Sequence, residues 1–287
     1  MSGAMQYEDG YWWSKDGLRL HYRDYAGPKE RPPILCLPGL TRNARDFESV
    51  AARLSPDWRV ICVDLRGRGE SAYAKDSMTY VPISYAQDVE LLLAHLKIKR
   101  FITFGTSLGG LVSMLLAVMG PKRIVGALLN DVGPVVEESG LTRIRMTVGK
   151  SQNWPTWVHA ARSLADAQGA TYPDYDLPDW VAMAKQLYRL GAQGRIVPDY
   201  DTKIAEPMRL PNEAFDLWPA FDVLCANPVL LLRGALSDVL SPSTANMMVQ
   251  RQDKLKLITV PRVGHAPSLN EPVTIKAINA LLKSVAV

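Results

Sequence analysis

The sequence predicts an α/β protein with a mostly parallel central sheet, helices on both faces of that sheet, and one helical insertion. Short runs rich in Ile, Val, Leu and Cys alternate with stretches of helical periodicity. Continuous apolar runs of this length are typical of parallel strands buried on both faces. Between residues 135 and 212 no strand pattern is found, and only helical patches and turn clusters occur there. Strands that alternate with helices at this spacing form parallel units, so the insertion interrupts an otherwise regular α/β domain.

The elements are expected in the following order. Residues 11–13 and 18–23 flank an Asp-Gly turn and are predicted to form an antiparallel hairpin at the N-terminal edge of the sheet. His21 in this hairpin is interpreted as a surface or cross-strand residue. Buried strands are predicted at residues 34–37, 60–63, 101–104, 124–129, 229–232 and 256–260. Helices are predicted at residues 44–54, 84–96 with Ser84 as cap, 111–119, 215–225, 243–250 and 271–282.

The insertion follows the sixth strand and is expected to lie over the carboxyl ends of the strands as a helical cap. The predicted core comprises residues 1–133 and 213–287, and the predicted cap comprises residues 134–212, with helical patches at 141–148, 157–167 and 179–190. Trp154, Trp157 and Trp180 are concentrated in the cap. Such residues most often form the packing of the insertion itself. Their second interpretation is the wall of a substrate pocket, to which Arg42 of the core is also assigned.

The composition and charge of the chain argue against nucleic-acid and membrane partners. Of the 287 residues, 47% are hydrophobic and 22% are charged, and the net charge of +4 is spread along the chain, so no nucleic-acid partner is expected. The longest apolar run, residues 111–119, is too short to span a bilayer, and residues 1–10 lack the pattern of a signal peptide. Cys36, Cys62 and Cys225 are interpreted as buried reduced thiols. A cytoplasmic protein is therefore expected.

The segment around Ser107 carries the strongest indication of chemistry. Residues 105–109 read Gly-Thr-Ser-Leu-Gly and lie between a β-branched apolar run and an apolar helical run. Strand, sharp turn and helix are the context of a G-x-S-x-G nucleophile elbow, in which the serine is strained and glycines leave room on either side. The hydroxyl then projects beside the positive N-terminal end of the next helix. The alternative interpretation is a turn at which a helix packs closely on a strand.

Several residues are expected beyond the carboxyl ends of the strands, where open α/β sheets bind ligands. They are Leu40, Asp64, Ser107, Asp131, Asp238 and His265. A serine nucleophile needs a base that takes its proton, and that base needs a carboxylate that fixes its tautomer. His265 is the predicted base, because it is the histidine expected on a loop after a strand, in a Gly-His-Ala-Pro turn.

Two aspartates compete for the place behind His265. Asp238 follows the strand at residues 229–232 and is the preferred acid. Asp131 follows the strand at residues 124–129, and its other interpretation is loop hydrogen bonding where the insertion leaves the sheet. A tetrahedral intermediate also needs two hydrogen-bond donors. The backbone N–H groups of Leu108 and Leu40 are the predicted pair.

Together these segments resemble the α/β-hydrolase-fold superfamily, in its serine esterase and lactonase branch with a helical cap. The resemblance covers about residues 12–280 and rests on residues 37–40, 64–71, 105–110, 233–238 and 264–272. The order Ser, Asp, His is the triad order of this fold. The family usually has His-Gly at the oxyanion turn, where this chain has Pro38 and Gly39. The donor there is a backbone N–H, which survives the change.

The resemblance implies a serine hydrolase that cleaves a small carboxylic ester or lactone through an acyl-enzyme. A serine at the elbow argues against haloalkane dehalogenases and epoxide hydrolases, which use an aspartate. A C–C bond hydrolase of the meta-cleavage type is one alternative, although those enzymes usually carry Trp where this chain has Ala266. A non-catalytic ligand-binding protein on the same scaffold is the other.

No cofactor is expected. The sequence has neither the His and Cys spacing of a zinc site nor a G-x-G-x-x-G dinucleotide loop. The expected partners are therefore an ester or lactone substrate and water.

Overall fold

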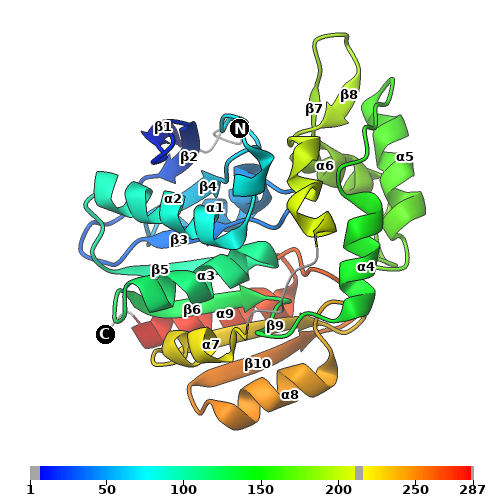
Figure 1. Ribbon diagram of the computed structural model, residues 1–287. Coiled ribbons are helices and arrows are strands. Elements are labelled where there is room, and N and C mark those ends of the chain that lie inside the picture. Colours follow the sequence, from blue (N-terminus) through cyan, green and yellow to red (C-terminus); the bar gives the residue numbers. More distant parts are fainter. Residues whose placement is uncertain (1–6, 211–215, 286–287) are drawn as a thin grey trace.

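The computed structural model describes residues 7–210 and 216–285, in which a central sheet is packed between helices (Figure 1). Within those residues the main sheet has eight strands in the order β1-β2-β4-β3-β5-β6-β9-β10. They are β1 (Glu8–Trp13), β2 (Arg19–Tyr25), β3 (Ile34–Leu37), β4 (Val60–Asp64), β5 (Phe101–Thr106), β6 (Ile124–Asn130), β9 (Val229–Gly234) and β10 (Leu255–Val260). The pairs β1–β2 and β2–β4 are antiparallel, and the other neighbouring pairs are parallel. The predicted mostly parallel sheet with an N-terminal hairpin is confirmed.

Helices cover both faces of this sheet. One face carries α2 (Pro82–His95), α3 (Leu108–Met119), α7 (Trp218–Leu224) and α8 (Pro242–Arg251). The other face carries α1 (Glu48–Leu54) and α9 (Pro272–Val285). The helix predicted at residues 44–54 is divided, because a short 3-10 helix, η1 (Ala44–Phe47), precedes α1. The predicted α/β fold class is confirmed.

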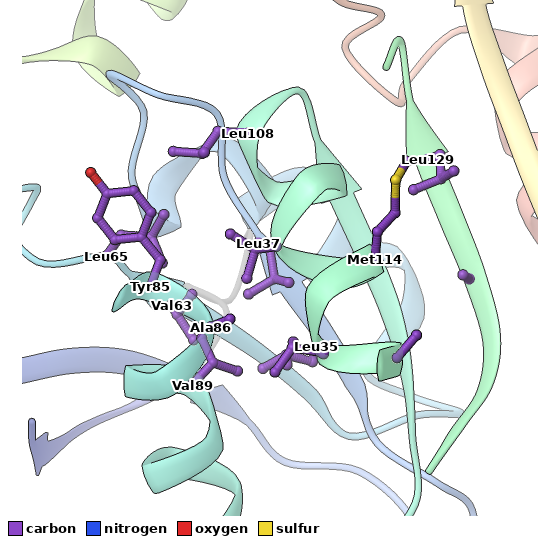
Figure 2. Packing of buried hydrophobic residues seen from close by; sticks show 14 of the residues in the cluster. Leu35, Leu37, Val63, Leu65, Tyr85, Ala86, Val89, Leu108, Met114 and Leu129 are labelled. Carbon is purple, nitrogen blue, oxygen red and sulfur yellow. The ribbon is translucent and has the colours of Figure 1, made fainter. Parts of the chain in front are cut away.

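The apolar residues of strand β3 contribute to the hydrophobic clusters on both faces of the sheet. All four of its residues are buried. Leu35 and Leu37 belong to the cluster formed with α2 and α3, whereas Ile34 and Cys36 belong to the cluster formed with α1 and α9. Successive side chains of a strand point to opposite faces, so both sets must be apolar. Figure 2 shows part of the first cluster, with side chains of the strands gathered beside α2 and α3.

The register of the parallel strands brings the candidate site residues together at the carboxyl ends of the strands. Thr106 at the end of β5 is paired with Asn130 at the end of β6. Ser107 and Asp131 therefore leave two neighbouring strands side by side. β9 follows β6, and β10 follows β9, in the same parallel set. The loops after four parallel strands thus open at the same end of the sheet.

The insertion follows β6 and lies over that end of the sheet (Figure 1). It contains α4 (Glu138–Thr147), α5 (Trp157–Gln168) and α6 (Leu177–Leu187), which confirms the predicted helical insertion after the sixth strand. The exact limits given to the cap, residues 134–212, stay a prediction. Residues 211–215, including the predicted start of a helix at Phe215, lie outside the described residues.

The insertion also contains a ribbon that the sequence pattern did not predict. β7 (Tyr188–Leu190) pairs antiparallel with β8 (Ile196–Pro198). The expectations of no strand in residues 135–212 and of a helix through residue 190 are therefore wrong. The Gly191 N–H donates to the Arg195 carbonyl (2.7 Å), and Gly194 has a φ of 68°, which closes the turn. Strands of three residues are too short to show a two-residue period in the sequence.

The start of α2 also differs from the expectation. The helix begins at Pro82, and the residue before it, Val81, is extended and makes no side-chain cap. Ser84 is therefore inside the helix and is not its cap. Proline is favoured at the first position of a helix, because its missing N–H would have no intrahelical partner there.

Two features were used to predict a cytoplasmic location: reduced cysteines and the lack of a membrane-spanning segment. Cys36, Cys62 and Cys225 are free and buried. Burial raises the pKa of the Cys225 thiol to about 12, so it stays protonated at neutral pH. Of the helices in the described part of the chain, none combines the length and the apolar character that crossing a bilayer requires. The cytoplasmic location stays a prediction.

His21 ties three strands together at the N-terminal edge. This residue of β2 is 1% exposed, and its Nδ1 lies 2.7 Å from Asp64 Oδ2 on β4. Its Nε2 lies 2.9 Å from Asp9 Oδ1 on β1. Only an imidazolium can donate to both carboxylates at once. Burial by itself lowers the pKa of His21, but the two carboxylates outweigh it and the pKa is raised. The surface interpretation of His21 is therefore wrong, and its cross-strand role is that of a buried histidine paired with a buried and an exposed carboxylate.

We expect the replacement His21→Gln to destabilise the protein more at low pH than at high pH. The folded-state pKa lies above the unfolded value of about 6.5, so the stabilisation is fully present below that pH and is lost as the pH rises through the folded pKa. Urea unfolding of both proteins on either side of neutrality measures the difference in free energy of unfolding. A difference that does not shrink as the pH rises contradicts this account.

Candidate active site

Ser107 lies in a sharp turn between β5 and α3. Its φ of 52° is in the left-handed region, which is strained for a residue with a side chain. A Cβ on Gly105 would lie 2.5 Å from the Gly109 carbonyl carbon, and a Cβ on Gly109 would lie 2.0 Å from the Leu37 carbonyl oxygen. Both positions therefore require glycine. The backbone has the elbow geometry that the pentapeptide predicts.

Ser107 and His265 meet as expected, and the acid behind the histidine is Asp131. His265 Nε2 lies 2.8 Å from Ser107 Oγ, and His265 Nδ1 lies 2.7 Å from Asp131 Oδ2. The three side chains come from the loops after β5, β6 and β10. They form a continuous chain of hydrogen bonds from a hydroxyl through an imidazole to a carboxylate.

The Asp131 carboxylate is fully buried and is held from two further sides. Its Oδ1 accepts from the Gly234 N–H (2.8 Å), and its Oδ2 also accepts from the Ser237 hydroxyl (2.6 Å). A carboxylate only accepts, so the network assigns the imidazole proton to Nδ1 of His265. Nε2 is then free to accept the hydroxyl proton of Ser107.

The expectation that Asp238 is the partner of His265 is wrong. Arg143 of α4 donates to both oxygens of Asp238, from Nε to Oδ2 (2.6 Å) and from Nη2 to Oδ1 (2.8 Å). This guanidinium lowers the pKa of Asp238, and the carboxylate raises the pKa of Arg143. Ser237, its neighbour in the turn after β9, supports Asp131 instead.

The choice between the two aspartates could not be made from strand order alone. β6 and β9 are neighbours in the sheet, so the loops after both strands reach the same space. One indication was available in the sequence: Asp131 lies two residues after the strand predicted at residues 124–129, whereas Asp238 lies six residues after the strand predicted at residues 229–232. A residue next to the strand end is held more closely by the sheet.

The two backbone donors predicted for the oxyanion hole are those of Leu108 and Leu40. Leu108 is the first residue of α3, where amides have no intrahelical acceptor. Leu40 lies in the loop after β3, and its carbonyl oxygen accepts from Nε of the buried Arg68 (2.8 Å). A Cβ on Gly39 would lie 3.7 Å from the Ser107 Cβ, so this loop runs close to the nucleophile. The use of these N–H groups as an oxyanion hole stays a prediction.

A cavity of about 610 Å³ opens at Ser107 and His265. Core residues, including Arg42, and cap residues, including Tyr172 and Tyr175, share its wall. A cavity of this size is within the range of sites that bind small molecules. The position of Arg42 in the wall agrees with the sequence-based assignment.

The three tryptophans assigned to the pocket wall lie elsewhere. Trp180 is buried in the cap cluster, and its ring meets those of Tyr172 and Tyr175 at centroid distances of 6.0 Å and 5.2 Å. Trp154 and Trp157 are packed against the same cluster. The first interpretation of these tryptophans, as packing of the insertion itself, is therefore confirmed, and the second, as part of the pocket wall, is corrected.

Comparison with known proteins places this geometry in a family. The profile described as "Alpha/beta hydrolase family" matches residues 34–277. A 3-hydroxybutyrate-oligomer hydrolase from Cupriavidus necator is 34% identical over 266 residues, which cover 90% of each chain. The chain belongs to the alpha/beta hydrolase family. The resemblance stated from its motifs is confirmed.

Two further proteins that are similar to this α/β hydrolase are also hydrolases. The crystal structure of an alpha/beta hydrolase from Novosphingobium aromaticivorans matches with a TM-score of 0.95 and 55% identity, covering 98% of this chain and 100% of that one. An esterase from Mycobacterium tuberculosis is 25% identical over 248 residues, covering 84% of this chain and 79% of the esterase. Hydrolases thus match most of the chain, and the protein is a hydrolytic enzyme.

The three arginines that line the cavity of the hydrolase, Arg42, Arg143 and Arg262, are each paired with an aspartate. Arg42 Nε donates to Asp46 Oδ2 (2.5 Å), and Arg262 is paired with Asp174. Burial by itself lowers the pKa of Arg42, but Asp46 outweighs it and the pKa is raised. In residues 7–210 and 216–285, no group of three or more His, Cys, Asp or Glu side chains could hold a metal ion.

We expect Asp131→Asn and Asp238→Asn to separate the two aspartates. Loss of the carboxylate behind His265 should lower kcat for ester hydrolysis by about 10³- to 10⁴-fold, because the imidazole loses its tautomer and its counter-charge. Asp238→Asn breaks the pair with Arg143 and should change kcat by less than about tenfold. Steady-state kinetics on one activated ester measures both. A larger loss for Asp238→Asn than for Asp131→Asn contradicts the geometry described above.

Proposed function

We propose that the chain is a serine hydrolase that cleaves a small carboxylic ester or lactone through Ser107, His265 and Asp131. The observation that carries the proposal is the pair of hydrogen bonds from His265 to Ser107 Oγ (2.8 Å) and to Asp131 Oδ2 (2.7 Å). These contacts lie at the wall of a cavity large enough for a small substrate.

In the first half of the reaction, Ser107 Oγ attacks the carbonyl carbon of the substrate. His265 Nε2 takes the hydroxyl proton, and Asp131 stabilises the imidazolium that forms. The negative oxygen of the tetrahedral intermediate accepts hydrogen bonds from the N–H groups of Leu108 and Leu40. His265 then returns the proton to the leaving alcohol oxygen, the C–O bond breaks, and an acyl-serine remains.

Water completes the second half. His265 accepts a proton from a water molecule, whose oxygen attacks the acyl carbon. The second tetrahedral intermediate uses the same two backbone donors. His265 then protonates Ser107 Oγ as the acyl–oxygen bond breaks, and the carboxylic acid leaves. With a lactone, the alcohol and the acid are parts of one released hydroxy acid.

The relatives support esters as the substrate class. The Cupriavidus necator relative acts on 3-hydroxybutyrate oligomers, in which ester bonds join short hydroxy acids, and the Mycobacterium tuberculosis relative is an esterase. Tyr172 and Tyr175 in the cavity wall suit a partly apolar substrate. Short esters of hydroxy acids are therefore the first substrates to test.

We expect Ser107→Ala to abolish labelling by a fluorophosphonate and to lower ester hydrolysis by at least about 10³-fold. The matched control is Ser151→Ala, which removes the hydroxyl of an exposed serine in the cap. Mass spectrometry of the labelled protein locates the adduct. An adduct on another residue, or full labelling of Ser107→Ala, contradicts the assignment of the nucleophile.

A substrate panel tests the reaction class. It contains esters of graded acyl size, short 3-hydroxybutyrate oligomers, lactones and one vinylogous diketone from ring fission. We expect turnover of the esters or lactones, and none of the diketone. Cleavage of the diketone in preference to every ester supports C–C bond hydrolysis instead. Absence of both turnover and a Ser107 adduct supports a non-catalytic binding protein.

A further inference from the structure

The loop that carries His265 has no regular secondary structure, and close to His265 the core holds the loop backbone at one residue on each side. It lies between β10 and α9. The Val263 carbonyl accepts from the Leu236 N–H (2.9 Å), and the Pro267 carbonyl accepts from Asn130 Nδ2 (2.9 Å). Both contacts are two residues away from His265. Neither fixes the two residues adjacent to it.

The adjacent residues are held by the cap. The Gly264 N–H donates to the Thr171 carbonyl (2.8 Å). On the other side of His265, the Tyr172 hydroxyl donates to the Ala266 carbonyl (3.0 Å) and accepts from the Ala266 N–H (3.1 Å). Two consecutive cap residues, between α5 and α6, therefore clamp the histidine on both sides.

Tyr172 is itself buried and closely packed. It is 5% exposed, its ring stacks on Tyr175 with centroids 4.8 Å apart, and the edge of Trp180 packs against it. It shares one buried cluster with Val260 and Val263, which lead into the His265 loop. Burial raises the pKa of the phenol, so the hydroxyl keeps its proton for Ala266 at neutral pH. A hydroxyl fixed in this way determines where the backbone of Ala266 lies.

We propose that Tyr172 is a positioning residue of the cap that holds His265 in line between Ser107 and Asp131. This inference rests on the proposed function and assigns the cap a part in the chemical step. The base must stay within hydrogen-bond reach of the serine, and a displacement of 1 Å costs on the order of 10²-fold in rate. A change in the position of residues 171–172 therefore changes the alignment of the base as well as the shape of the cavity.

The test is Tyr172→Phe, which removes the hydroxyl and keeps the ring in its stack. Both hydrogen bonds to Ala266 are lost. We expect kcat for an activated ester to fall about 10- to 100-fold while KM changes less than about threefold, because the substrate wall is retained and the base is misaligned. The rate of phosphonylation of Ser107 should fall by a similar factor.

Tyr80→Phe is the matched control. Tyr80 is also a buried tyrosine whose hydroxyl makes two hydrogen bonds, accepting from the Ala74 N–H (2.8 Å) and donating to Asp201 Oδ2 (2.7 Å). It has no contact with the His265 loop among the hydrogen bonds of the described residues. Thermal unfolding of both variants shows whether each stays folded. We expect similar losses of stability and a loss of kcat only in Tyr172→Phe.

A spectroscopic readout does not depend on turnover. The proton on Nδ1 of His265, bonded to Asp131, gives a downfield resonance that histidine-labelled protein and a His265→Gln spectrum assign. We expect this resonance to broaden or shift in Tyr172→Phe and to stay unchanged in Tyr80→Phe. An unchanged resonance with wild-type kcat in a folded Tyr172→Phe overturns the inference, as does an equal kcat loss in both variants.

If the wild type forms no Ser107 adduct, the proposed function fails, and the resonance of the His265 Nδ1 proton still decides whether Tyr172 positions His265.

Discussion

The buried carboxylate of Asp131 is the contact on which the arrangement of the site depends. It accepts hydrogen bonds from the Gly234 N–H, the Ser237 hydroxyl and His265 Nδ1. Three loops, after β6, β9 and β10, are thereby tied to one side chain. A buried carboxylate without donors is strongly unfavourable, so the three loops must keep their positions together. The group that orients the imidazole is also the group that joins the strand ends.

The cap is integrated with the core through more than one contact. Its hydrophobic cluster includes Val260 and Val263 of the core. Near the other end of the cap, Arg45 of η1 donates to Asp199 Oδ2 (2.6 Å), and the Asp199 carbonyl accepts from the Gly69 N–H (3.1 Å). The cap therefore contributes to the geometry of the core loops in addition to walling the cavity. The hydrogen bonds of Tyr172 to Ala266, the residue after His265, are one more contact of this kind.

Some residues of the site could be predicted from the amino-acid sequence, and others could not. The elbow at Ser107 was predictable because two steric requirements, the close approaches at Gly105 and Gly109, leave glycines at fixed spacing. The acid was not predictable with the same certainty, because Asp131 and Asp238 follow neighbouring strands. In the structure Asp131 bonds His265, whereas Asp238 bonds Arg143 of α4, and these contacts join residues 134 and 95 positions apart. Similarly, the tryptophans of the cap form its packing, whereas Tyr172 and Tyr175, in the loop between two cap helices, are among the residues of the cavity wall.

The sequence by itself determined the α/β sheet, the place of the insertion and the pairing of Ser107 with His265. Each of these follows from local chemistry: apolar runs of strand length, helical periodicity, and glycines where no Cβ fits. Tertiary structure decided the partner of His265, the residues that face the cavity and the contact of Tyr172 with the histidine loop. These depend on the directions of side chains at the ends of neighbouring strands and on contacts between core and cap. Such directions are set only when distant segments pack together, because burial then selects which polar groups must satisfy one another.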